Sequence, residues 1–411
     1  MTPTPGASSS AHLEGTTLEG GGQLLRIALG LSTLTKKPIS ITNIRGRRSG
    51  GGGLKAQHLT SLQWLGEMCN AKITGSELKS RTITYVPDTT RSVGQHLQTG
   101  EVRIQQSTPG SVSLVLQAIL PYVLFSGAQL PIYVRITGGT NVSNSPSYDY
   151  ITQVLLPMLQ LIGIPQIDTQ LHSRGWSQGT ASIGSATFTI MPLTTKLSAF
   201  QLLDRGNITS ISATIIAPKH TDQHFREELD VMFERRLSRF SSTNSKAGKE
   251  PDTIITFEDS HHEKRYYLLL VATTSAGMKL GRDWLYDGGS RPGKQEQVIP
   301  SMVKKVSDDL LAELGHGGCV DEYLRDQLVV FQALAVGRSH VYGGRREDDM
   351  LVRPSLHTKT AQWVAKEILG VEFDEQGSCE GIGFYVGSKG ATGEEEKEVV
   401  QQLSNFNVID T

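Results

Sequence analysis

Helical and strand-like segments alternate along the first half of this 411-residue chain. Apolar residues recur at helical spacing from Leu24 to Leu34, whereas Pro38–Ile44 alternates apolar and polar residues as a strand does. The same two patterns recur at Ala56–Cys69, Ser111–Phe125 and Tyr148–Ile162 for helices, and at Lys72–Thr74, Arg81–Val86, Pro131–Thr137 and Thr187–Met191 for strands. Such alternation is typical of helices packed on sheets, so we predict an α+β fold of the α/β-sandwich kind, with units of similar size that are consistent with duplicated modules.

The character of the sequence changes at about Leu197. Ile208–Ala217 is a β-branched run, Gln223–Phe240 is a charged amphipathic helix, and Tyr266–Thr273 is a strongly apolar strand. Met1–Glu14 is rich in Pro, Ser and Thr and has no secretory-signal pattern. We therefore predict a disordered tail at 1–14, a large domain formed by 15–196 and 313–411, and a smaller α/β domain inserted at 197–312.

The formal net charge of −1 gives the chain no global field that would attract a polyanion, so such a ligand would need a local basic cluster. The apolar run Leu114–Phe125 is interrupted by Gln117 and Pro121, which indicates a buried helix rather than a membrane span. Cysteines are too few and too scattered for a disulfide framework: Cys69, Cys319 and Cys379. We expect an intracellular protein, in the nucleus rather than the cytoplasm.

Two segments near the N-terminus have compositions that suit phosphate binding. Glycines at 20–22, between Glu19 and a helix that carries Arg26, let backbone N–H groups converge on an anion. A glycine-rich turn that only caps the helix explains the same residues. The second segment combines glycines with cations, and a solvated basic loop is its alternative interpretation; its cations are Arg45, Arg47, Arg48, Lys55 and His58.

Two later segments could surround a nucleotide. The turn Gly138–Asn141 follows a strand and precedes Pro146, although a plain turn is an equal alternative. Tyr323, Asp326 and Gln327 fall on one helical face at i, i+3 and i+4, where they could hold an adenine or a ribose or orient an imidazole. An acid-rich first turn of a helix is the alternative there.

His357 precedes a helical pattern in the segment Arg353–Ala361. Its neutral imidazole would be a competent nucleophile near pH 7, because the ordinary pKa of histidine is about 6.5. A lone histidine in this position is more often a capping or surface residue, so the residue by itself does not identify an enzyme.

Taken in order, seven segments resemble the RNA 3′-terminal phosphate cyclase family, over about residues 15–176 and 312–385. These segments are Glu19–Arg26, Ile44–Arg48, Gln57–His58, Pro109–Gln117, Gly138–Asn141, Gly317–Leu328 and Pro354–Thr360. The resemblance implies a large domain of three repeated units, each a four-stranded sheet with two helices, and a smaller inserted domain. It also implies a ligase that forms a phosphoric ester bond, using ATP and a divalent cation (Mg or Mn) to convert RNA 3′-phosphate ends to 2′,3′-cyclic phosphates.

The resemblance also assigns residues. His357 matches the nucleophile that becomes covalently adenylated before the adenylate moves to the RNA end. The positions that match the surroundings of ATP are Gln117, Pro146, Tyr323, Asp326 and Gln327. The positions that match the cluster around the phosphates, the metal and the RNA end are Glu19, Arg26, Arg45, Arg48 and Gln57, with Glu19 as the candidate metal ligand.

The chain also departs from the family pattern. Ser173–Ser182 stands where the family usually has a lysine followed by three glycines, and Gly281–Leu285 replaces a Gly-Lys-Arg-Gly stretch. A non-catalytic alternative therefore stays open: a protein resembling the cyclase-like ribosome-assembly factor, which binds partners and pre-ribosomal RNA. That branch is expected to lack the histidine nucleophile, so His357 favours the enzyme.

Overall fold

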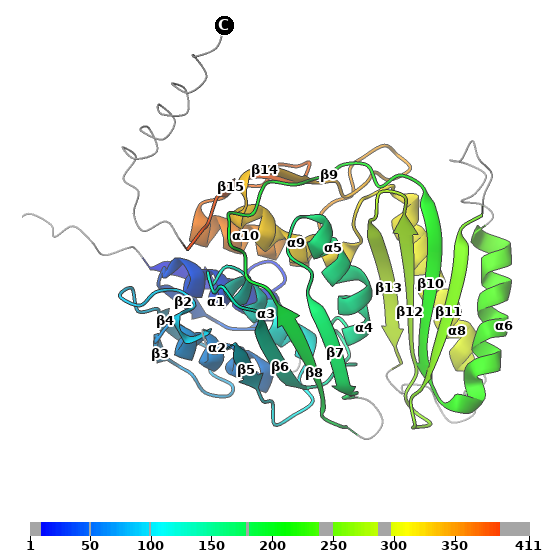
Figure 1. Ribbon diagram of the computed structural model, residues 1–411, viewed down its shortest axis with the longest axis horizontal. Coiled ribbons are helices and arrows are strands. Elements are labelled where there is room, and N and C mark those ends of the chain that lie inside the picture. The colour runs from blue at the N-terminus through cyan, green and yellow to red at the C-terminus, as the bar shows by residue number, and fades with distance from the viewer. Residues whose placement is uncertain are drawn as a thin grey trace, which may run out of the picture.

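Four small β-sheets and the helices packed on them form the molecule (Figure 1). The computed structural model describes residues 10–48, 51–97, 100–177, 181–237, 250–286 and 297–386. Three sheets belong to one large body whose helices pack against each other, and the fourth sheet forms a smaller body at its side (Figure 1). The mixed α/β architecture agrees with the predicted fold class.

The first sheet has the strand order β1-β2-β4-β3. Its elements are β1 (Ala11–Glu14), β2 (Ile39–Thr42), β3 (Lys72–Thr74), β4 (Ile83–Val86), and the helices α1 (Gly22–Thr35) and α2 (Ala56–Met68). Strand β1 pairs in parallel with β2, with Ala11 opposite Ile39. This strand corrects the predicted tail at 1–14, because order begins before Gly15; residues 1–9 lie outside the described residues.

The second sheet has the order β5-β6-β8-β7, with β5 (Glu101–Ile104), β6 (Ile132–Gly138), β7 (Asp168–Ser173) and β8 (Gly184–Ile190). It carries α3 (Val112–Leu124) and a composite helix of α4 (Tyr148–Tyr150), the π-helical turn η2 (Ile151–Leu155) and α5 (Leu156–Leu161). Ser111 caps α3 and Ser147 caps α4, each through a side-chain oxygen that accepts a backbone N–H bond.

The third sheet contains three strands among the described residues, in the order β15-β14-β9, rather than the four that the resemblance implied. Its elements are β9 (Gln201–Leu202), β14 (Val336–Val341), β15 (Ser378–Ile382) and the helices α9 (Glu322–Leu334) and α10 (Leu356–Leu369). Gln201 in β9 pairs with His340 in β14. The chain therefore remains in the large body until Leu202, and the insertion begins after the predicted boundary at 197.

The inserted body is a sheet of order β11-β10-β12-β13 with two helices on its outer face (Figure 1). Its strands are β10 (Ile208–Ala217), β11 (Asp252–Asp259), β12 (Tyr267–Thr274) and β13 (Lys279–Leu285), and its helices are α6 (Asp222–Met232) and α8 (Val298–Gly315). Besides η2, the described residues contain the short helical turns η1 (Gln95–Leu97), η3 (Lys219–Thr221) and η4 (Phe233–Leu237). The predicted helix Gln223–Phe240 thus ends its regular part at Met232.

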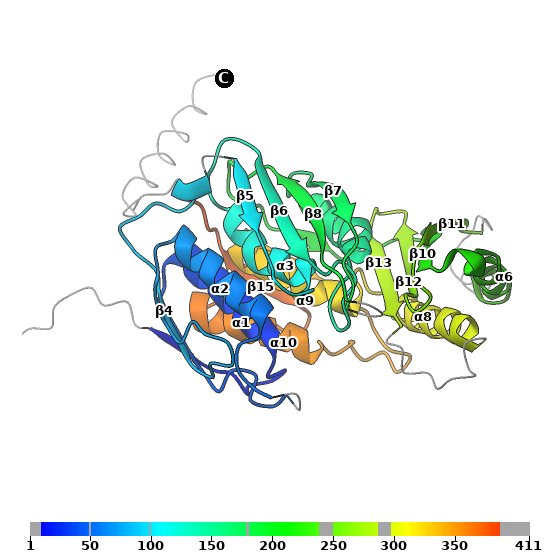
Figure 2. The same ribbon diagram turned by 90° about the horizontal axis from the view of Figure 1, so that it is seen from below.

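Helix α1 lies at the centre of the large body, between α2 and α10 (Figure 2). It is buried from Gln23 through Leu34, because α3 packs against it as well. A helix with so few exposed positions normally carries only apolar side chains. The buried Gln23 and Arg26 at its N-terminal end are therefore exceptions that need polar partners.

The inserted body has a hydrophobic core of its own, to which Phe225 and Leu229 of α6 contribute. We expect Leu229→Ala to lower the free energy of unfolding by about 2–5 kcal/mol, because Leu229 is fully buried. Urea unfolding measures this loss. The control Val231→Ala, on the same helix but 44% exposed, is expected to change it by less than about 1 kcal/mol. Equal losses in the two variants would contradict the packing of α6 on the sheet.

Candidate active site

A cavity of about 420 Å³ lies where the inserted body meets the large body. Its volume is within the range of sites that bind a ligand of nucleotide size. The walls come from α1, α3, the loop between β6 and α4, α4 itself, strands β12 and β13, helices α8 and α9, and the start of α10. Segments more than 300 residues apart in the sequence therefore meet here, as Gln23 and Asp326 do.

Seven of the eleven residues to which the family resemblance assigned a role line this cavity. They are Arg26, Gln117, Pro146, Tyr323, Asp326, Gln327 and His357. The other four, which are Glu19, Arg45, Arg48 and Gln57, are not part of its wall. The structure thus separates the positions predicted to surround ATP from most of those predicted for the phosphates and the metal.

His357 is the second residue of α10, in its first turn. The helix is capped by Ser355, whose hydroxyl accepts a bond from the Thr358 N–H at 3.1 Å. Its imidazole is open to the cavity and has no hydrogen-bond partner among the described residues. Partial desolvation lowers its pKa below 6.5, and the positive charges of Arg26 and Arg48 lower it further. The ring is consequently neutral at pH 7 and free to act as a nucleophile, at a helix end that favours anions.

Arg26 is the hub of a buried polar network. Its Nε donates to Gln117 Oε1 at 2.7 Å, and its Nη2 donates to Gln23 Oε1 at 2.6 Å. Gln23 in turn donates to Asp326 Oδ2 at 3.1 Å. Burial lowers the pKa of Arg26 to about 10, so its guanidinium stays charged at neutral pH. The network therefore holds a fixed positive charge beside the open imidazole of His357.

Asp326 takes part in this network through only one of its two carboxylate oxygens, Oδ2, which accepts the bond from Gln23. Its Oδ1 is buried and has no hydrogen-bond partner, although the residue lines the cavity. Burial raises the pKa of Asp326 to about 7 from its ordinary 3.8. An unpaired acceptor in such a place is destabilising unless a ligand supplies the donor.

The raised pKa predicts how Asp326 affects stability. Between about pH 4 and pH 7 the folded chain retains a proton that the unfolded chain releases, so stability falls as the pH rises through that window. Asp326→Asn removes this effect. We expect the free energy of unfolding of the variant, relative to wild type, to rise between about pH 4 and pH 7 in urea titrations and to level off above that. A pH-independent difference would mean that Asp326 is ionised throughout.

Tyr323 forms a flat wall of the cavity. Its ring meets the edge of Tyr150 at a centroid distance of 6.1 Å, and the Arg282 guanidinium lies 4.4 Å from its centroid. Arg282 is itself held by Glu313 and Glu322. Because Arg282 lines the neighbouring cavity and not this one, it supports the ring from behind and leaves another part of Tyr323 facing the ligand space.

Glu19 is bonded to the helix that carries His357. Its backbone N–H donates to Oγ1 of Thr360, which lies one helical turn after His357 in α10, at 3.1 Å. Its carboxylate accepts the Gly21 N–H at 2.7 Å and pairs with Arg48, which is about half exposed. No group of three or more His, Cys, Asp or Glu side chains suited to a metal ion occurs within the described ranges. A metal here would need ligands from elsewhere, such as phosphate oxygens.

The remaining two predicted residues have local structural partners. Arg45 is buried and donates to the Gly53 carbonyl at 3.4 Å. Gln57 Oε1 accepts the Ser111 N–H at 3.2 Å, at the start of α3. His58 beside it accepts the Lys55 N–H at Nδ1, and burial lowers its pKa to about 3, so it is neutral.

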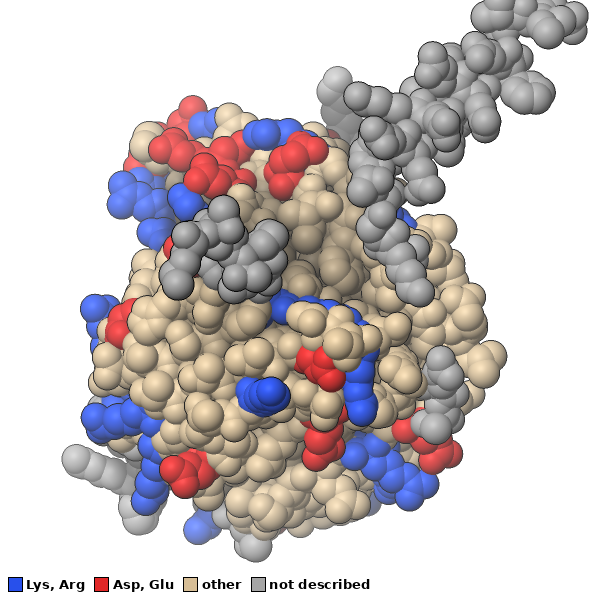
Figure 3. Space-filling view, turned by 90° about the vertical axis from the view of Figure 1, so that its left-hand side faces the viewer, with Lys and Arg blue, Asp and Glu red and all other residues tan. Residues whose placement is uncertain are grey.

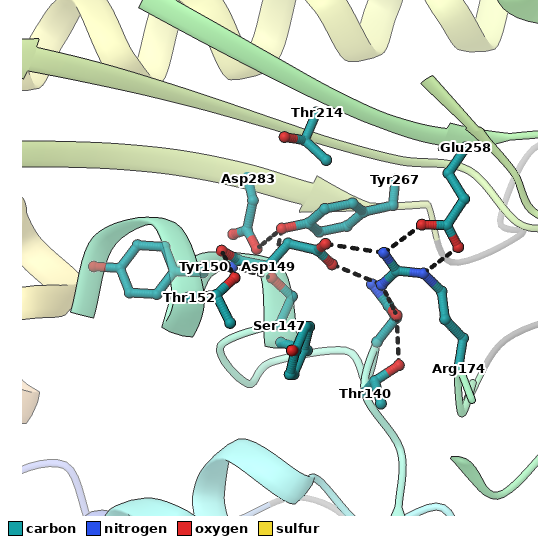
Figure 4. Close-up of polar contacts among 12 residues, drawn as sticks. Thr140, Ser147, Asp149, Tyr150, Thr152, Arg174, Thr214, Glu258, Tyr267 and Asp283 are labelled. Atoms are coloured by element: carbon teal, nitrogen blue, oxygen red, sulfur yellow. Dashed lines mark hydrogen bonds and ion pairs between the residues drawn. The ribbon is translucent and has the colours of Figure 1, made fainter. Parts of the chain in front are cut away.

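The inserted body contributes a wall that sequence reasoning missed. Tyr267 donates to Asp283 Oδ2 at 2.9 Å, and its hydroxyl lies 2.5 Å from Ser147 Oγ (Figure 4). All three residues line the cavity, and burial raises the pKa of Asp283 to about 6. Asp283 lies in the segment that departs from the family pattern, and that departure was the one signal in the sequence.

The outer face of the large body shows Lys and Arg side chains scattered between acidic ones (Figure 3). Neither sign gathers into one broad patch among the described residues of that face. This face therefore offers no broad positive field to a polyanion. Within the described part of the chain, no helix is both long and apolar enough to span a bilayer.

Comparison with known proteins gives one consistent match. A family model described as RNA 3′-terminal phosphate cyclase matches residues 17–374. The chain is 31% identical over 386 residues to a Drosophila melanogaster protein named RNA 3′-terminal phosphate cyclase, covering 92% of this chain and 98% of that protein. Proteins of the same name are 32% identical over 338 residues in Staphylothermus marinus (80% and 85% covered) and 29% over 378 residues in Pyrococcus furiosus (92% and 96%).

Proposed function

Because this chain belongs to the RNA 3′-terminal phosphate cyclase family, we propose that it uses ATP to convert RNA 3′-phosphate ends to 2′,3′-cyclic phosphates. One observation carries the proposal furthest: the unpartnered imidazole of His357 opens into the cavity that also contains Gln117, Pro146 and Tyr323. The names of the relatives favour this enzyme over the non-catalytic ribosome-assembly alternative, and so does the presence of His357.

In the first step, a ring nitrogen of neutral His357 attacks the α-phosphorus of ATP. The nitrogen–phosphorus bond forms as the bond to the bridging oxygen breaks, and pyrophosphate leaves with that oxygen and its electrons. The lowered pKa of His357 keeps the attacking lone pair free at pH 7. An oxygen of the RNA 3′-phosphate then displaces the histidine from the adenylate, and the adjacent 2′-hydroxyl finally attacks the 3′-phosphate and expels AMP.

Arg26, which lines the cavity, and Arg48, whose positive charge lowers the pKa of His357, would stabilise the charge that develops on the leaving pyrophosphate. Glu19 fits a divalent cation in one respect: Mg²⁺ in nucleotide sites is commonly held by one or two carboxylates together with phosphate oxygens. The cation, Mg or Mn, would add positive charge at the phosphates. Glu19 would hold it after releasing Arg48.

Asp326 and Gln327 would bind the nucleoside. The free Oδ1 of Asp326 is an acceptor that matches a ribose hydroxyl or a base amino group. Tyr323 and Pro146 offer flat, apolar surfaces for the base.

The direct test is end conversion. An oligoribonucleotide with a 3′-phosphate, incubated with the protein, ATP and Mg²⁺, is expected to acquire an end that alkaline phosphatase cannot remove. The same oligonucleotide with a 3′-hydroxyl should not change, and omission of ATP should stop the reaction. A 3′-phosphate that remains phosphatase-sensitive, or that is converted equally without ATP, would reject the proposed function.

A further inference from the structure

Asn141 has an unsatisfied hydrogen-bond donor in the wall of the cavity. The residue is 1% exposed and lies on the loop that follows β6. Its Nδ2 is buried and has no hydrogen-bond partner in the described part of the chain. A buried NH₂ group without an acceptor is costly, so its persistence at a cavity points to a ligand that supplies the acceptor.

The orientation of this amide is fixed by Arg174 together with Thr140, whose hydroxyl donates to Asn141 Oδ1 at 2.7 Å. Arg174 Nη1 lies 3.3 Å from Asn141 Oδ1, and an arginine can only donate, so the carbonyl oxygen must face it and the NH₂ group must face away. Arg174 is itself rigid. It donates to both oxygens of Asp149 at 2.8 and 3.0 Å and to both oxygens of Glu258 in β11 at 2.5 and 2.7 Å (Figure 4).

The surroundings of Asn141 indicate which part of a ligand it meets. The Tyr148 N–H donates to the Thr140 carbonyl at 2.9 Å, which places Ser147 and its partners Tyr267 and Asp283 beside Asn141. A carboxyl group on this wall disfavours phosphate, and Arg174 is already shared by two carboxylates. These carboxylates favour an uncharged acceptor atom over a phosphate oxygen as the partner of Asn141 Nδ2.

We propose that Asn141 recognises the nucleobase. Its Nδ2 donates a hydrogen bond to a ring nitrogen of the bound purine nucleotide, and Arg174 is a positioning residue that orients the amide. The inference rests on the proposed function, because ATP is the occupant. The base is the part of ATP that has both neutral ring acceptors and flat faces suited to Tyr323 and Pro146.

Nucleotide analogues test this contact atom by atom. In 1-deaza-, 3-deaza- and 7-deaza-ATP one ring nitrogen is replaced by C–H, which accepts no hydrogen bond. We expect one of the three to compete with labelled ATP about tenfold less well than ATP does on the wild-type protein. Asn141→Asp keeps the oxygen that Arg174 needs but replaces the donor by an acceptor. It should bind ATP at least about tenfold more weakly and lose the preference for ATP over that analogue.

Two further variants separate recognition from folding. Asn144→Asp makes the same change at an exposed residue of the same loop and cavity, and should keep the wild-type analogue preference. Arg174→Met leaves the Asn141 amide held by the Thr140 hydroxyl alone, which can donate or accept and so permits the flipped amide. It should reduce the preference, whereas Arg174→Lys should retain part of it. A merely structural role of Arg174 would lower thermal stability without changing the ratio of ATP to analogue binding.

The outcomes are distinguishable. If the wild-type protein binds no ATP, the proposed function fails and this inference fails with it. If the wild type binds ATP but treats all three analogues alike, or if Asn141→Asp retains the wild-type preference, only the inference is overturned. A preference that is lost in Asn141→Asp and kept in Asn144→Asp supports it.

Discussion

Replacing His357 with alanine is expected to abolish covalent labelling by α-labelled ATP, with a loss of about three orders of magnitude or more. The reason is that the imidazole itself forms the bond to phosphorus, so no neighbouring group can substitute for it. The fold should survive, because this side chain is exposed and makes no hydrogen bond within the described residues. Denaturing gel electrophoresis after incubation with ATP and Mg²⁺ measures the label.

The matched control is His316→Ala. His316 lines the neighbouring cavity rather than that of His357, and its replacement should leave the labelling unchanged. The stepwise reaction gives a sharper test: an RNA whose 3′-phosphate is already adenylated needs no histidine nucleophile. His357→Ala should therefore still cyclise the preadenylated RNA. Two results would show that His357 has another role. One is covalent labelling of His357→Ala by ATP, and the other is failure of His357→Ala to cyclise the preadenylated RNA.

The elements with long periodic patterns were predictable from the sequence, and the short edge strands were not. The structure begins α1 at Gly22 and ends it at Thr35, close to the predicted Leu24–Leu34. Strand β1 has four residues in a Pro/Ser/Thr-rich context, and β9 has two, so neither offers enough alternation to be recognised. Only pairing with β2 and β14 makes them strands.

The same limit applies to the site. The spacing of Tyr323, Asp326 and Gln327 predicted one helical face, and all three line the cavity. Contacts between segments far apart in the chain could not be predicted from the sequence. An example is the ion pair between Arg174 and Glu258, which lie 84 positions apart. In the sequence Arg174 was only a departure from a glycine pattern, and its bonds to two carboxylates depend on how the inserted body docks.

The role of Gln23 could not be predicted from the sequence either. It lies inside a segment that resembles the family, yet nothing in its spacing distinguishes it from an ordinary helix residue. Its importance comes from burial, which forces every polar atom to find a partner. In the structure it joins Arg26 to Asp326 and so couples the positive charge near His357 to the acid that we propose as an acceptor for the nucleoside.

This coupling makes Arg26 the second residue whose replacement should be severe. We expect Arg26→Gln to lower the rate of covalent labelling about 10²–10³-fold, because it removes a fixed positive charge from the site where pyrophosphate departs. The positive charge of Arg26 also lowers the pKa of Asp326. In Arg26→Gln that pKa should rise, and so should the pKa of His357, which the same charge lowers. Because labelling needs a neutral His357, its rate should reach its plateau at a higher pH than in wild type.

Arg26→Lys separates charge from geometry. Lysine keeps the charge but cannot bond Gln117 and Gln23 together as the planar guanidinium does. It should therefore restore the wild-type pH profile and only part of the rate. Arg47→Gln removes a cation from the exposed basic loop, outside the cavity, and should change neither. Single-turnover labelling across pH measures both quantities. If Arg26→Gln matched the wild-type rate, Arg26 would be a structural link between α1 and α3 and not part of the phosphate site.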